Sequence, residues 1–178
     1  MKSKEITLGG IMVALTVIIL YGAAILPINK LAILTIASAV VPICIIRANV
    51  KTGILVFSAS SIISLFFIPL NIWLLYTLVF GGFGIVKYYI EKLNKVSTEM
   101  ILKFLYFNGI FILTAAAGKI LLNVDLFKMS AEMISKYVSI NSSGIILVLF
   151  WIIALGALYV IDYALTLIIS FYLERIHK

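Results

Sequence analysis

Two ionisable residues, Lys119 and Asp162, lie within long apolar stretches of the sequence and are its most informative candidates for chemistry. A charge inside a membrane is costly, so such a residue usually faces a helix bundle or a cavity and has a partner. At about 1.5 Å per helical residue, Lys119 lies near the end of its stretch and Asp162 near the middle of its own. We therefore do not expect them to pair, and Lys87 and Asn108 are the candidate partners of Asp162.

Each of the two residues has a structural and a functional interpretation. Asp162 is either a polar clamp between helices or part of a binding site. Lys119 either extends its ammonium to the headgroups along an apolar stem, or anchors an anionic group of a small ligand. The second interpretation of Lys119 favours a ligand with a carboxylate or a phosphate.

Helical spacing places each of these residues on a face with other candidates. One face carries Trp151, Leu155, Tyr159 and Asp162, and the other carries Asn108, Ile112, Ala115 and Lys119. If the faces meet, they form a cavity with an aromatic wall, a polar floor and a lysine near its mouth, which is typical of a small-molecule site. Ordinary packing is the alternative.

Trp73 and Tyr76 are two further candidates for substrate binding. Both lie near one end of a predicted span, where aromatic residues also form the belt at the membrane interface. The predicted substrate-binding residues are therefore Trp73, Tyr76, Lys119, Trp151, Tyr159 and Asp162.

Composition identifies the class of protein that must position these residues. Hydrophobic residues make up 64% of the 178 positions, charged residues make up 12%, and the mean hydropathy is +1.24. Soluble domains carry roughly 25% charged residues, so the composition predicts a membrane protein. In a membrane protein, the net charge of +7 is explained by lysines and arginines on the cytoplasmic side. It therefore does not indicate binding to nucleic acid.

The apolar stretches predict an all-α protein of six transmembrane helices in a single domain, 1–178. A helix crosses the hydrocarbon core with about 20 residues, so the uncharged stretch 53–86 is long enough for two crossings. Its break is expected at 68–71, where Pro69 removes a backbone donor and Asn71 favours a turn. The predicted spans are 6–26, 31–47, 53–68, 72–91, 101–122 and 144–173. We expect the first to be retained rather than cleaved as a signal peptide.

The distribution of basic residues predicts the orientation, with the N-terminus and the C-terminus both cytoplasmic. The cytoplasmic segments then carry Lys2, Lys4, Arg47, Lys51, Lys87, Lys92, Lys95, Lys103, Arg175 and Lys178. The outer segments carry Lys30, Lys128 and Lys136. Such a bias requires an even number of spans.

Two connecting segments have their own predictions. The outer segment 123–143 has apolar residues at helical spacing, and is either a helix on the outer leaflet or a lid over an outward-facing pocket. The mixed-charge segment 87–103 is predicted to be a solvated helical surface that contacts lipid headgroups or a partner.

Enzymatic activity is not expected from this sequence. It has no HExxH, GxSxG or CxxC motif, no Walker motif and no cluster of paired carboxylates. We therefore expect no catalytic residues, no metal site and no cofactor, and any energy from ATP would come from another subunit.

Small residues and one longer tract carry a resemblance to a known family. Gly10 and Ala14, four positions apart in the first span, form a surface that permits close helix contact. The tract VPICIIRANVKTGILVFSASSIISL combines a proline, a short basic turn with Gly53 and a serine-rich helix. With six spans in under 200 residues, the chain resembles the substrate-binding S component of an energy-coupling factor (ECF) transporter.

The resemblance implies a multi-pass protein of the bacterial plasma membrane that binds a vitamin or related micronutrient outside the cell. A transmembrane coupling protein and two ATPase subunits would be its partners, and Gly10 and Ala14 would contact the coupling protein. In that family the loop after the first span often caps the ligand. Here that loop is very short, so 123–143 is the candidate cap.

The competing interpretation is a membrane scaffold of the MreD cell-shape type, which transports nothing. Replacing Lys119, Trp151 or Tyr159 with alanine should leave partner binding of a scaffold intact, whereas a carrier should lose affinity for its ligand.

Overall fold

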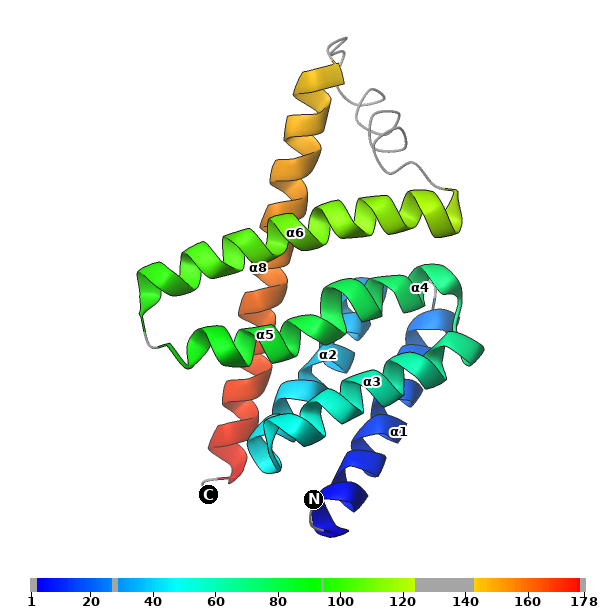
Figure 1. Ribbon diagram of the computed structural model, residues 1–178, viewed down its shortest axis with the longest axis vertical. Coiled ribbons are helices and arrows are strands. Elements are labelled where there is room, and N and C mark those ends of the chain that lie inside the picture. Colours follow the sequence, from blue (N-terminus) through cyan, green and yellow to red (C-terminus); the bar gives the residue numbers. More distant parts are fainter. Residues whose placement is uncertain (1–2, 27–28, 94, 124–142, 177–178) are drawn as a thin grey trace.

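The computed structural model describes residues 3–26, 29–93, 95–123 and 143–176, and all of its regular elements are helices (Figure 1). They are α1 (Ser3–Ile25), α2 (Lys30–Arg47), α3 (Val50–Phe67), α4 (Leu70–Leu75), η1 (Tyr76–Gly81), α5 (Gly82–Glu91), α6 (Val96–Leu122) and α8 (Ser143–Ile176). Because α4, η1 and α5 join into one helix, Leu70–Glu91, six helices are long and apolar enough to cross a membrane. The predicted all-α protein with six spans is confirmed.

The turns between the first four spans follow local residue chemistry. Asn29 adopts the left-handed conformation, with φ of 57°, directly before α2. The Asn49 side chain caps α3 by accepting the Thr52 backbone N–H at 2.9 Å. Between α3 and α4 the chain is extended at Ile68, and Pro69 directly precedes the first residue of α4. The predicted break at 68–71 is confirmed.

Close packing around α2 forms the centre of the fold. Its side chains are mostly buried, and it contacts α1, α3, α5 and α8. Gly84 of α5 permits one of these contacts, because a Cβ there would lie 2.8 Å from Pro42 Cδ and 3.3 Å from the Ser38 carbonyl oxygen. A small residue therefore permits close helix packing in the fourth span.

The fourth span contains a π-helical segment, η1, in its middle. Such segments are rare and shift the register of the side chains that follow. Tyr76, its first residue, is fully buried, and its phenol oxygen lies 3.0 Å from the Ser60 hydroxyl of α3. Gly81, its last residue, would bring a Cβ to 2.7 Å from the Phe57 ring.

The last two helices are arranged differently from the others. In Figure 1, α8 runs along the length of the molecule and α6 crosses it steeply, and α8 ends at the same end at which α1 begins. Helix α6 begins five residues before the predicted start of its span, at Val96, so only a short turn separates it from α5. That early start moves Lys103 from the first turn of the predicted span to the interior of the helix.

Candidate functional site

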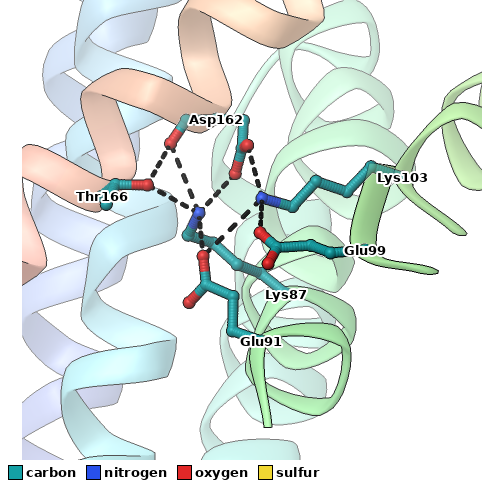
Figure 2. Close-up of polar contacts among 6 residues, drawn as sticks. All are labelled: Lys87, Glu91, Glu99, Lys103, Asp162 and Thr166. Carbon is teal, nitrogen blue, oxygen red and sulfur yellow. Dashed lines mark hydrogen bonds and ion pairs between the residues drawn. The ribbon is translucent and has the colours of Figure 1, made fainter. Parts of the chain in front are cut away.

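A buried group of charged side chains lies where α5, α6 and α8 meet (Figure 2). We call it the ion cluster and define it as Lys87, Glu91, Glu99, Lys103, Asp162 and Thr166. Both lysines and the aspartate are buried, with exposed fractions of 1% for Lys87, 6% for Lys103 and 9% for Asp162. The two glutamates lie at its more exposed edge.

Asp162 is the residue that joins the three helices. One of its carboxylate oxygens accepts from Lys87 of α5, and the other lies 2.7 Å from Lys103 Nζ of α6. Lys87 also contacts Glu91 at 2.6 Å and donates to the Thr166 hydroxyl at 2.8 Å. Lys103 contacts Glu99 at 2.7 Å. Every charged group of the cluster therefore has a partner of opposite charge.

The spacing in the sequence explains how three helices converge on this point. Each contributes two residues four positions apart, which share one helical face: Lys87 with Glu91, Glu99 with Lys103, and Asp162 with Thr166. The first two pairs are arranged in opposite order on either side of the connection between α5 and α6. An antiparallel hairpin consequently brings their lysines to the same level.

The electrostatic balance of the cluster favours a clamp between helices. Two ammonium groups face three carboxylates, so the formal charge is −1. Buried charges are tolerated only when partners and hydrogen bonds compensate for their lost hydration, and removing one partner is strongly destabilising. The polar-clamp interpretation of Asp162 and its predicted pairing with Lys87 agree with these contacts.

The prediction of a solvated surface over 87–103 is wrong at both of its ends. Lys87 and Lys103 are buried, because α5 and α6 turn these side chains towards Asp162. The cluster residues that the sequence analysis missed are Glu91, Glu99, Lys103 and Thr166. The charged members could have been identified from the sequence, because a lysine and a glutamate lie four positions apart both before and after the connection between α5 and α6.

Two of the predicted aromatic residues lie where α8 crosses α6. Trp151 Nε1 donates to Asn108 Oδ1 at 2.9 Å, and the Tyr159 ring packs edge-on against Phe107 with centroids 5.3 Å apart. Asn108 therefore bonds to Trp151 rather than to Asp162. The two predicted faces meet at this crossing.

The other half of the predicted α6 face does not join that contact. Ile112 is 68% exposed, and Lys119 is exposed in the last turn of the helix. Neither side chain is brought to Asp162. The steep crossing of α6 and α8 accounts for this, because crossed helices contact over only a short length.

Trp73 and Tyr76 lie on a different surface, against α3. Trp73 Nε1 donates to the Ser61 carbonyl oxygen at 2.7 Å, and Tyr76 meets Ser60 as described above. The structure therefore distributes the six predicted substrate-binding residues over three places: the α3 contact, the α6–α8 crossing with the ion cluster, and the exposed end of α6. Residues 124–142 of the candidate cap, 123–143, lie outside the described residues.

A pocket lies between α2 and α8, and no predicted site residue lines it. Its volume is about 490 Å³. The lining residues come from the start of α2 and the middle of α8: Leu31, Ala32, Thr35, Ile36, Ala157, Val160, Ile161, Ala164 and Ile168. The wall is apolar apart from Thr35, so this pocket suits hydrocarbon groups.

No known protein family, curated protein or solved structure matches this chain. Within the described ranges, no three His, Cys, Asp or Glu side chains are grouped in a way that would hold a metal ion. The chemistry of the site therefore has to be argued from the ion cluster, the α2–α8 pocket and the exposed helix surfaces.

Proposed function

We propose that this protein is the substrate-binding S component of an ECF-type importer in a bacterial plasma membrane. It would capture a vitamin or related micronutrient outside the cell and release it inside, together with a coupling protein and ATPase subunits. The observation that carries the proposal is an open surface on α1, at the positions where the resemblance to this family expects contact with the coupling protein.

That surface has the properties required for close helix contact. Gly10 and Ala14 are both exposed, and a Cβ added at Gly10 would meet no atom within 4 Å. Ile6, Ile11 and Ile18 on the same side of the helix are also exposed. In lipid, small residues let two helix backbones approach, so an apolar surface with a shallow centre suits a partner helix.

The opposite side of α1 explains why this surface faces outward. Gly9, Thr16 and Leu20 are buried, and a Cβ at Gly9 would lie 3.3 Å from Thr52 Cγ2 of α3. One side of the helix is thus occupied by the protein's own bundle. The other side is left for lipid or a partner.

The remaining features fit a passive carrier whose energy comes from partner subunits. The ion cluster would fix α8 to the α5–α6 hairpin, so that the helices could move together as one body when the carrier reorients. The ligand would be held by the transmembrane helices.

Co-purification with a coupling module tests the proposal, using Gly10→Trp to block the α1 surface. The matched control is Gly156→Trp on α8, because a Cβ at Gly156 also meets nothing within 4 Å. We expect the wild type and G156W to retain the coupling protein and G10W to lose it, with all three unfolding at similar temperatures.

Two outcomes would contradict the proposal. If G10W and G156W bind the coupling protein equally, the α1 surface is not the contact. If the wild type binds neither a coupling protein nor any small molecule, the carrier assignment fails. A scaffold of the MreD type would then be tested by its binding to cell-shape proteins.

A further inference from the structure

The pocket between α2 and α8 has a composition that selects for uncharged ligands. Its volume of about 490 Å³ is within the range of about 300 to 1,000 Å³ that is usual for small-molecule sites. Ala32, Ala157 and Ala164 leave the space open because their side chains are short. The floor includes Ile161, which packs against both buried hydrophobic clusters of the protein.

The lining offers almost nothing to a charged or strongly polar group. Thr35 provides the one hydroxyl, and that hydroxyl already donates to the Leu31 carbonyl oxygen at 2.8 Å. Asp162 is the neighbour of Ile161 in the chain, but both of its carboxylate oxygens are bound to lysines on the other side of α8. An ion in this pocket would lose its hydration without compensation.

The described interior also holds no lysine that is free to bind an anion. Lys87 and Lys103 are the buried lysines, and Glu91, Glu99 and Asp162 neutralise them. Lys119, the anchor suggested by the sequence, is exposed at the end of α6. Among the described residues, no buried lysine is therefore available to bind an anionic ligand.

The pocket opens on the outer surface of the helix bundle. Leu31, Ile36 and Val160 line it and are 54%, 50% and 68% exposed, so its rim is continuous with the apolar outer surface of the two spans. A pocket of this size holds a whole small molecule. A phospholipid would leave its headgroup and second chain outside.

We propose that the ligand of this protein is an uncharged, predominantly apolar small molecule that binds between α2 and α8, an inference that rests on the proposed role as a carrier. Thr35 then supplies at most one hydrogen bond, by accepting from a donor on the ligand. The ion cluster lies behind the site and does not contact the ligand.

Photolabelling with a matched pair of probes tests this inference. The probes are a medium-chain alkyl alcohol with a diazirine on its chain and the carboxylic acid of the same chain, at pH 8, where the acid is ionised. Labelled peptides are mapped by mass spectrometry in the full-length protein in lipid nanodiscs. Increasing amounts of unlabelled 1-decanol serve as competitor.

The variants Ala164→Phe and Ala157→Phe fill the pocket, and two positions are used in case one variant fails to fold. The control is Ala116→Phe, which makes the same change at an exposed alanine of α6 outside the pocket. We expect the alcohol to label 31–36 and 157–168 saturably, and about tenfold or more above the acid. Both pocket variants should lose this labelling and A116F should keep it.

Three results would overturn the inference. They are equal or stronger labelling by the acid, labelling by the alcohol that phenylalanine in the pocket does not reduce, and displacement by phospholipid but not by 1-decanol. Each would leave the binding of the coupling protein by the α1 surface untouched, so the carrier assignment is judged separately by the G10W experiment.

Discussion

The helices around α2 and the helices α6 and α8 are held in place by different physical means. Buried residues make up 56% of an apolar 18-residue segment of α2, but 11% of such a segment of α6 and 12% of one of α8. Around α2, small residues and interdigitated side chains bring backbones together. Helices α6 and α8 are held largely by contacts between charged side chains, and most of the apolar surface of these two helices faces outward.

The difference teaches where each region is vulnerable. A packed interface loses stability when volume changes, in either direction. A clamp built from ions loses stability when the charge balance changes, since a buried charge left alone is more costly than the pair was favourable. Substitutions that preserve volume but remove charge should therefore affect the two regions unequally.

The largest effect is expected from Asp162→Asn. The change keeps the size of the side chain but leaves Lys87 and Lys103 without their shared carboxylate, which should cost about 3–5 kcal/mol of unfolding free energy. Thermal unfolding of purified protein in detergent measures it. Lys119→Ala is the control, because that lysine is exposed and should be almost neutral.

Replacing the three buried charged residues together is a second test of the clamp. The triple variant K87M/K103M/D162L removes both lysines and the aspartate, so that no buried charge of the cluster is left without a partner. We expect it to be more stable than D162N, since apolar residues of similar volume often replace a buried ion set without loss. If D162N unfolds at the same temperature as the wild type, or if the triple variant unfolds at a lower temperature than D162N, the cluster does not act as a clamp.

A smaller effect is expected from Gly84→Ala in the packed region. The added methyl group would lie against Pro42 and the Ser38 carbonyl, and overpacking of this kind costs about 1–3 kcal/mol. Gly156→Ala makes the same change where there is open space, so it should be neutral or slightly stabilising. Equal unfolding temperatures for the two variants would mean that α2 and α5 are not packed as closely as described.

The smallest effect separates two tryptophans. Trp73→Phe removes a donor to the Ser61 carbonyl of α3, and Trp151→Phe removes a donor to the Asn108 side chain at the α6–α8 crossing. Each should cost about 0.5–1.5 kcal/mol, with W73F at the upper end because its acceptor is a fixed backbone carbonyl, whereas Asn108 is a side chain that can turn to another partner. Chemical denaturation of the two variants against the wild type measures the difference, and a larger loss for W151F would reverse our ordering.

Much of the fold could be predicted because it depends on properties of single segments. Runs of apolar residues longer than a bilayer crossing predict the spans, and Pro69 marks the break within the longest run. The placement of Asp162 within an apolar helix was enough to predict an interior position and to nominate Lys87. The site was harder to predict, because Lys103 resembles the exposed lysines near it when only the sequence is considered.

The sequence by itself determined that this chain forms six apolar helices, where the fourth span begins, and that at least one buried charge needs a partner. Only the tertiary structure decided which partners meet. The rotation and crossing of α5, α6 and α8 turn Lys103 inward and leave Lys119 outside, and the approach of α2 to α8 leaves an apolar pocket. Spacing along a helix predicts which residues share a face, but the face that a distant helix presents depends on packing summed over the whole bundle.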